Sequence, residues 1–286
     1  MGGILLDWSK TKTIFIVVFF ILNIFLFTLF LKKYQSMQLD ELPELTIDQR
    51  MAEDNITYSN LPTTSEPHPY LNARVHRFSN TDINELEGQT ASVKYDIVLD
   101  SQLNTPIDLE DPSSPDELRE YIDEYVMGGE QYRLWSYEEE EDRLIYYQHF
   151  EDMPIYHNIT GRMVVHLNDQ DQVISYEQTM LTSIEEFAED QNLINPRQAL
   201  EGFYRRNAIE PNSTVVDYEL GYYTFIQLNE TAAETQVLTP TWRMVFEQED
   251  GDQESLYINA VNPSLIEIDL ESLEFEQLEE IEETVE

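Results

Sequence analysis

The chain has 286 residues, of which 57 are acidic and 16 are basic, so its formal net charge is −41. This charge excludes nucleic acid as a partner, because nucleic acid is bound through neutralisation of its phosphates by Lys and Arg. The absence of cysteine excludes disulfides, thiol nucleophiles and thiolate metal sites. Apolar residues make up 41% of the chain, which is enough to build a packed domain.

An uncharged apolar run extends from Ile14 to Leu31. At about 1.5 Å per helical residue it reaches roughly 27 Å, close to the ~30 Å of a bilayer's hydrocarbon core. A cleavable signal peptide is the alternative, but its apolar region is usually about 7–15 residues long and ends at small residues, whereas Lys32, Lys33 and Tyr34 follow here. We therefore expect residues 14–31 to be a single transmembrane helix in the lipid bilayer.

The flanks of this run carry four of the 16 basic residues, namely Lys10, Lys12, Lys32 and Lys33. The positive charges are balanced, so they do not decide the orientation. The short N-terminus, residues 1–13, precedes one large segment, and this order favours a signal anchor in the cell membrane with a cytoplasmic N-terminus. The later segment, which is then extracytoplasmic, holds all but one of the acidic residues.

One side of the predicted membrane helix has its own character. Phe15, Phe19, Asn23 and Phe27 recur every four residues and so share one helix face. An amide near the bilayer midplane favours a hydrogen bond to another helix, although measured contributions average only about 0.6 kcal/mol. Our hypothesis is that this face contacts another membrane helix. A passive anchor with a tolerated Asn is the alternative.

The outer segment divides by composition. Residues 32–69 are rich in polar residues and contain three prolines after Asn60, which predicts a stalk and entry loop. Two α+β units are expected next, at residues 70–184 and 185–270. Residues 271–286 predict a solvated acidic tail, because like charges dominate them.

Each unit begins with a helix signal. In the first, Ser114 is the expected N-cap, Pro115 the first helical residue and Glu117 the capping-box partner, and Gly128 ends the helix. Strands are predicted at residues 132–137, 143–150, 162–167 and 173–181, with a turn at Asn168 to Asp171.

In the second unit, Asn195, Pro196 and Gln198 occupy the same cap, first-turn and return positions. Strands are predicted at residues 216–228, 239–248 and 255–261, the last two joined by a hairpin at Glu249 to Asp252. The predicted fold class is therefore α+β, with one transmembrane helix followed by an extracytoplasmic tandem of helix-plus-antiparallel-sheet units.

Motifs for catalysis are not found in the sequence. His149, His157 and His166 lie in or beside predicted strands, but their spacing is not a known metal-ligand pattern and ordinary strand positions explain them. The Asn168 turn lacks the Gly and the bidentate Glu of a calcium loop. Nucleophile elbows, phosphate loops and metal helices are also missing. We predict that the protein is not an enzyme and needs no cofactor or metal.

Several segments resemble a known family. The runs Asp7 to Ile16 and Ile21 to Leu26 are similar to the opening of YycI (WalI), a family of membrane-anchored regulators of the WalK (YycG) sensor histidine kinase in low-GC Gram-positive bacteria. Further matches are Tyr147–Gln148, Pro154 to Asn158, Ile174 to Thr179, Pro240 to Arg243 and Tyr257 to Ala260. The strand motifs also resemble PepSY-like helix-and-sheet modules.

The resemblance implies a two-component regulator that acts with a YycH-like membrane protein on a WalK-like sensor histidine kinase, through transmembrane and ectodomain contacts, and so tunes cell-wall homeostasis. It implies no catalytic residue. The alternative function is a stand-alone extracytoplasmic PepSY-like module that inhibits a protease or binds a ligand. An anchored wall hydrolase, the third class, lacks a nucleophile or metal signature.

Overall fold

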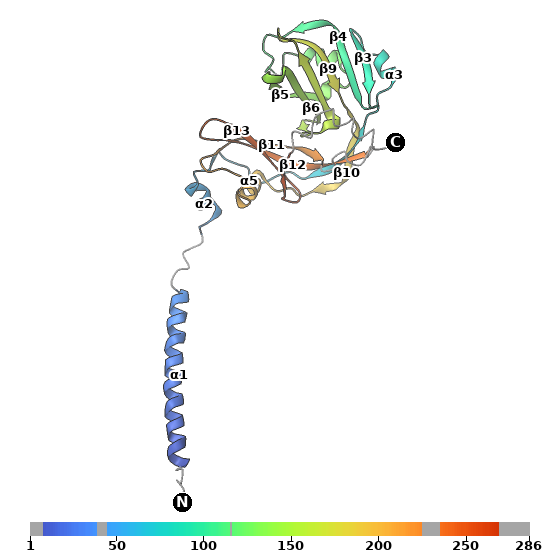
Figure 1. Ribbon diagram of the computed structural model, residues 1–286. Helices are drawn as coiled ribbons and strands as arrows, with labels where there is room; N and C mark the ends of the chain where they lie inside the picture. The colour runs from blue at the N-terminus through green and yellow to red at the C-terminus, as the bar shows by residue number, and fades with distance from the viewer. Residues whose placement is uncertain (1–7, 39–44, 115, 225–234, 269–286) are drawn as a thin grey trace, which may run out of the picture. The chain divides into compact units, whose positions relative to one another are not determined.

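The structure, a computed structural model, describes residues 8–38, 45–114, 116–224 and 235–268 (Figure 1). The chain forms two compact units, Met1–Arg50 and Met51–Glu286, and each is described by itself. The predicted acidic tail, residues 271–286, lies outside the described residues, as do residues 1–7 of the predicted cytoplasmic N-terminus.

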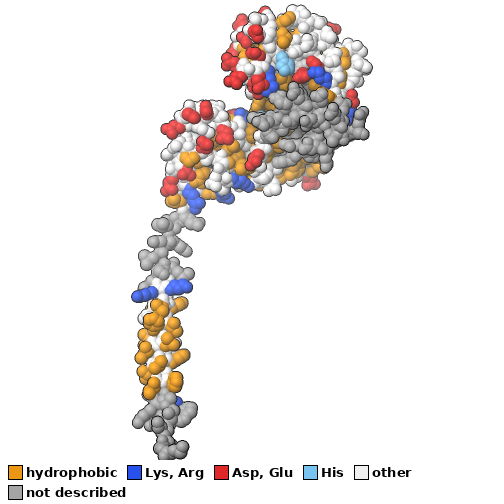
Figure 2. Space-filling model, viewed as in Figure 1, with side chains coloured by type: hydrophobic (Ala, Val, Ile, Leu, Met, Phe, Trp, Pro, Cys, Tyr) orange, Lys and Arg blue, Asp and Glu red, His pale blue; other side chains and the backbone are white. Residues whose placement is uncertain are grey.

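The first unit is dominated by one long helix, α1 (Trp8–Gln38). Within it, Lys12–Lys33 has a mean hydropathy of 3.0 and no buried residue, so it is a candidate membrane span by length and composition. Figure 2 shows the apolar side chains as a continuous band with Lys side chains at its end. The helix is longer than the predicted residues 14–31, because neither flank contains the Pro or Gly that would end it.

The described residues of the second unit form two sheets of seven strands each. Sheet I has the order β3-β4-β9-β8-β6-β5, and β7 pairs with β6. All of its pairs are antiparallel. Its strands are β3 (Gln89–Lys94), β4 (Val98–Asp108), β5 (Tyr132–Glu138), β6 (Arg143–Phe150), β7 (Met153–Pro154), β8 (Arg162–Leu167) and β9 (Gln172–Gln178).

Sheet II has the order β1-β11-β12-β13-β14, and β2 pairs with both β12 and β10. Only the β1–β11 pair is parallel among its described strands. Its strands are β1 (Thr57–Tyr58), β2 (His68–Val75), β10 (Leu181–Gln191), β11 (Thr214–Thr224), β12 (Thr235–Glu247), β13 (Gln253–Asn259) and β14 (Leu265–Ile266). An apolar helix followed by a sheet-rich domain confirms the predicted α+β class.

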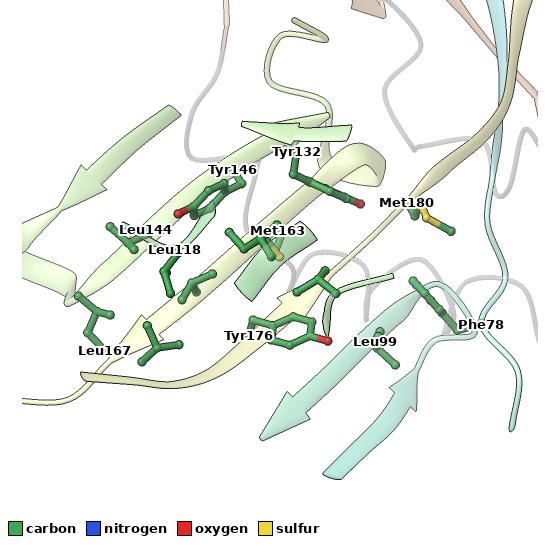
Figure 3. Close-up of a cluster of buried hydrophobic side chains, with 14 residues drawn as sticks. Phe78, Leu99, Leu118, Tyr132, Leu144, Tyr146, Met163, Leu167, Tyr176 and Met180 are labelled. Carbon is green, nitrogen blue, oxygen red and sulfur yellow. The ribbon is translucent and has the colours of Figure 1, made fainter. Parts of the chain in front are cut away.

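One face of sheet I holds a large apolar core (Figure 3). Tyr132 of β5, Tyr146 of β6 and Met163 of β8 contribute side chains to this core. Leu118 and Ile122, at the start and in the middle of α4 (Arg119–Tyr125), cover it. The Tyr132 hydroxyl donates to Thr179 O over 2.5 Å, which satisfies a phenol that is fully buried. The short helix α3 (Asn80–Asn84) contributes Ile83 at the edge of this core.

Sheet II is covered by α5 (Pro196–Arg205). The Phe203 ring meets the Phe246 ring edge to face, with centroids 6.0 Å apart. The helix begins as predicted: Asn195 Oδ1 accepts from Gln198 N over 2.9 Å, and the Gln198 side chain returns to Asn195 N. The predicted cap of this helix is confirmed.

The helix of the first predicted unit begins later than expected. Its N-cap is Leu118 rather than Ser114, and Pro115 lies outside the described residues. The reason is local competition, because Glu117 Oε1 accepts from Glu110 N over 2.6 Å instead of closing a box with Ser114. Three 3₁₀ turns complete the helical elements described: η1 (Gly129–Gln131), η2 (Glu139–Glu141) and η3 (Ile159–Gly161).

The two predicted hairpin turns are present. Asn168 Oδ1 accepts from Gln170 N and Gln172 N, each over 3.0 Å, and so shapes the β8–β9 turn. The β12–β13 turn has Gly251 at φ 92°, a left-handed conformation that favours glycine. Of the strand predicted at residues 216–228, β11 ends at Thr224, and residues 225–228 lie outside the described residues.

The sheets do not follow the expected consecutive units. β2 was expected to enter the first unit, at residues 70–184, but it pairs with β10 and β12 in sheet II. β10 itself runs across the expected boundary at residues 184 and 185. The prediction grouped strands that are consecutive in the chain. In the structure, the two sheets are formed by pairing between strands that are distant in the chain.

Part of the predicted stalk, residues 32–69, is also folded. It contains β1 and the helix α2 (Ile47–Glu53). Met51 and Ile56 are buried, and Thr57 N donates to Ser213 O over 3.0 Å. Residues 51–58 therefore belong to sheet II and its core.

Candidate functional site

The predicted contact face lies on α1. Phe15, Phe19 and Phe27 are 71%, 67% and 60% exposed, and together with Asn23 they follow one side of the helix. Unshielded phenyl rings over several turns suit either lipid tails or a second helix. Contact of this face with another helix stays a prediction.

Asn23 already makes one hydrogen bond inside α1. Its Nδ2 donates to Phe19 O, four residues earlier, over 2.8 Å. This bond satisfies one amide proton, which would matter in a bilayer, where an unpaired polar group is costly. Among the described residues, the Asn23 side chain makes no further hydrogen bond, so its Oδ1 and second amide proton remain available to a neighbouring helix.

A second candidate site lies between the two sheets. We call it the inter-sheet cluster and define it by Trp135, Tyr147, Tyr156, His157 and Tyr257. Trp135 and Tyr147 come from sheet I, Tyr257 comes from sheet II, and Tyr156 and His157 lie in the loop between β7 and η3. Sequence reasoning did not assemble this group.

His157 is the centre of the inter-sheet cluster. Its ring centroid lies 5.1 Å from that of Trp135 and 5.4 Å from those of Tyr147 and Tyr257, in edge-to-face arrangements that favour aromatic pairs. Its Nε2 lies 2.9 Å from the Tyr257 hydroxyl. Its Nδ1 is buried without a partner among the described residues.

Positive charge borders the same cluster. The Arg243 guanidinium lies 4.8 Å from the Trp135 ring centroid, and its Nη1 is 3.6 Å from Asp217 Oδ2 and 3.9 Å from Glu219 Oε2. Burial lowers the pKa of His157 to about 4, and repulsion from Arg243 and Arg162 adds to this effect. The imidazole is therefore neutral at pH 7.

A closed set of hydrogen bonds lies beside the cluster. Asn158 Nδ2 donates to Gln236 Oε1, and Gln236 Nε2 donates to Thr160 Oγ1, each over 2.9 Å. Thr160 then donates to Asn158 Oδ1 from its hydroxyl over 2.7 Å and from its backbone N over 2.9 Å. All three side chains are buried, and each makes hydrogen bonds to the other two. The ring therefore joins β12 of sheet II to η3 through satisfied polar groups.

The backbone closes the junction as well. Ile155 pairs with Tyr222 in a parallel bridge, and Tyr156 N donates to Tyr222 O over 2.8 Å. A Cβ at Gly221 would lie 2.4 Å from Pro154 O and 2.6 Å from the Tyr156 ring, so only glycine fits there. The inter-sheet cluster and its hydrogen bonds therefore provide close packing and neutral polar contacts, which hold the two sheets together.

The three histidines weighed as metal ligands are not brought together. His149 lies with Nδ1 3.3 Å from Tyr147 O, His157 lies in the cluster, and His166 Nε2 is 3.6 Å from Glu177 Oε2. Burial lowers the pKa of His149 to about 4. Among the described residues, no group of three or more His, Asp or Glu side chains is arranged to hold a metal ion.

The inter-sheet cluster had one signal in the sequence. Four of the segments that carry the family resemblance contribute to it or to its neighbours: residues 147–148, 154–158, 240–243 and 257–260. Their convergence depends on the bridge from Ile155 to Tyr222 in β11 and on the pairing of β11 with β12 and of β12 with β13, which the sequence alone did not reveal.

The helix and the sheets together define a class: an α+β domain joined to a candidate membrane anchor. Comparison with known proteins makes this specific, because the chain matches the YycI protein family over residues 36–261 and belongs to that family. YycI is a regulatory family rather than a known enzyme family. The match begins after the apolar run and covers all of sheet I and all of sheet II except β14.

No curated protein matches the chain. Among solved structures, the chain is similar to an uncharacterized protein from Eubacterium rectale ATCC 33656, with 11% identity and a TM-score of 0.46. The similarity covers 76% of this chain and 92% of the other. At this level it carries no argument about function.

Proposed function

We propose that this protein is a membrane-anchored regulator of a WalK-like sensor histidine kinase and that it acts together with a YycH-like membrane protein. Membership of the YycI family over residues 36–261 is the observation that carries the proposal. The apolar window Lys12–Lys33 supports it, since it provides a membrane anchor of the required length.

The proposed mechanism is differential helix packing. A regulator shifts its kinase between two states only if it binds one state better than the other. A difference of about 1.4 kcal/mol changes the ratio of the states tenfold, so modest contacts suffice. Phe15, Phe19 and Phe27 offer large surfaces for such packing, and Asn23 offers its remaining hydrogen-bonding atoms.

The proposal places residues 1–13 in the cytoplasm and the sheets outside the cell, where the high acidity keeps the domain soluble. Protease protection of the full chain in oriented vesicles tests this orientation. Digestion of the sheets by protease added from the cytoplasmic side would reverse it.

The helix mechanism is tested by two matched variants of the full chain. In the first, Phe15, Phe19, Asn23 and Phe27 are all changed to Leu. In the second, Val17, Ile21, Phe25 and Thr28 on the opposite side of α1 are changed to Leu, which again removes one polar side chain with a backbone bond, from Thr28 Oγ1 to Phe25 O. Both variants keep an apolar span.

The readouts are co-purification with the kinase and kinase autophosphorylation in reconstituted membranes. The first variant should lose most co-purification and shift autophosphorylation, while the opposite-side variant should behave as the parent chain. Equal behaviour of the two variants would contradict a specific helix face. Recovery of a protease in place of the kinase would contradict the regulatory function itself.

A further inference from the structure

The strand β10 is an open edge of sheet II. It pairs with β2, and no other described strand pairs with its second side. From Glu185 to Asp190 every residue is exposed, so this part of the strand has no covered face. Figure 1 shows it at the margin of the sheet.

The side chains of this edge combine one aromatic ring with four carboxylates. Phe187 is 48% exposed, more than any other large hydrophobic side chain described outside α1. Glu185, Glu186, Glu189 and Asp190 surround it, and none of them forms an ion pair with a described residue. The strand contains no Lys or Arg.

Ordering such a segment needs compensation. Fixing the backbone costs about 1–2 kcal/mol per residue, and here no side-chain burial offsets it. The pairing with β2 is also interrupted, with register shifts between Thr182 and Glu185 and between Phe187 and Gln191, and with Ser183 and Ala188 at positive φ. A strand added to the open side of β10 would form hydrogen bonds with its unpaired backbone groups and would cover the Phe187 ring from solvent.

The charges decide which strand can cover it. Charged side chains protect an edge against pairing with a strand of the same charge. A second copy of β10 would place carboxylates opposite carboxylates, which destabilises a strand pair. A strand with Lys or Arg at those positions would instead be stabilised by each pair of opposite charges. The carboxylates of β10 therefore disfavour pairing with a second copy of β10 and favour pairing with a basic strand.

We propose that β10 is a docking edge for a basic, extended segment of a partner protein, which adds to sheet II as a further antiparallel or parallel strand and packs an apolar side chain on Phe187. Backbone hydrogen bonds supply affinity, and the carboxylates supply specificity. This surface is independent of the helix face on α1, so either can fail without the other.

The test uses the full chain in nanodiscs of neutral phosphatidylcholine, which does not attract a basic probe. The probe is a fluorescent peptide of alternating lysine and valine with a central phenylalanine, and binding is measured by anisotropy. Changing Glu185, Glu186 and Glu189 to Gln and Asp190 to Asn should weaken binding at least about tenfold. Phe187→Ser should weaken it several-fold.

The matched control removes four exposed carboxylates elsewhere, by changing Asp116 to Asn and Glu120, Glu124 and Glu140 to Gln. It should bind the probe within about twofold of the parent chain. Backbone N-methylation along one edge of the peptide should abolish binding, while methylation along the other edge should not. All variants concern exposed side chains, and their urea midpoints verify that they fold.

Three results would overturn the proposal. The parent chain does not bind the probe, the control variant loses as much affinity as the β10 variant, or methylation of neither edge matters. The second result would indicate attraction to the overall negative charge, and the third would exclude strand addition.

Discussion

Tyr257 in β13 and His157 in the loop after β7 are joined by a hydrogen bond of 2.9 Å between the phenol oxygen and Nε2. The bond connects residues 100 positions apart and holds a neutral imidazole between the two sheets. Protonation of that imidazole would bring a third positive charge beside Arg243 and Arg162. The junction should therefore weaken in acid.

The pH dependence of stability has a defined direction. The pKa of His157 is about 4 in the folded chain, compared with about 6.5 for an exposed histidine, so the unfolded state binds more protons between these values. The stability from the neutral ring is complete above about pH 6.5 and is lost as the pH falls toward 4. His149 adds a similar loss. Each contributes a slope of up to about 1.4 kcal/mol per pH unit.

Urea unfolding of the full chain in detergent, followed by tryptophan fluorescence between about pH 7 and 4.5, checks this slope. His157→Asn should flatten it, because Asn does not titrate and tolerates the φ of 47° found there. His149→Gln should remove a separate part of the pH dependence of the free energy of unfolding. An unchanged slope in the double variant would show that other groups control acid stability.

Gly221→Ala should destabilise the second unit strongly. The added methyl group would meet Pro154 O at 2.4 Å, and a backbone atom cannot move aside as a side chain can. We expect a loss of at least about 1–3 kcal/mol, measured as a lower urea midpoint. The control is Gly88→Asn, where a Cβ meets nothing within 4 Å and the φ of 72° suits Asn. Equal midpoints for the two variants would contradict the close approach.

Gln236→Leu should cost about 1–3 kcal/mol, because it leaves Asn158 Nδ2 buried without an acceptor. A double-mutant cycle with Asn158→Ala should show strong coupling, since both changes break the same ring. Gln102→Leu, at an exposed position of β4, provides a control with the same change in side chain. Additive losses in the cycle would indicate that the ring does not act as a unit.

Asn195→Ala should remove the cap of α5. It deletes the bond to Gln198 N and also the bond from Asn195 Nδ2 to Thr63 O, so we expect a loss of about 1 kcal/mol or somewhat more. Asn195→Asp keeps the capping acceptor but not the donor, and it should recover most of the stability. Thermal unfolding of the full chain distinguishes the two, and equal midpoints would place the stability in the Thr63 contact.

Local features were predictable from the sequence, and distant pairings were not. The cap at Asn195, the turn at Asn168 and the apolar helix α1 depend on residues within a few positions of each other, so spacing rules located them. The first helix was placed too early because Glu117 has a competing partner at Glu110, outside the capping pattern.

The inter-sheet cluster shows why the rest was missed. His157 was visible only as a strand-like histidine, because its neighbours Trp135 and Tyr257 belong to different sheets. Placing them together requires knowing that the loop after β7 bridges to β11 at Tyr222 and that β11, β12 and β13 pair side by side. Alternation within a strand indicates which face is buried, but it does not identify the neighbouring strand.

The interleaved strand order also affects how the chain folds as the ribosome makes it. Sheet I is built from β3 to β9, a continuous stretch that is complete once Gln178 has been synthesised. β1 and β2 are made earlier, yet their partners β10, β11 and β12 are made only after sheet I. These two early strands must therefore wait unpaired while sheet I is synthesised, and an unpaired strand edge is prone to misassembly during that interval.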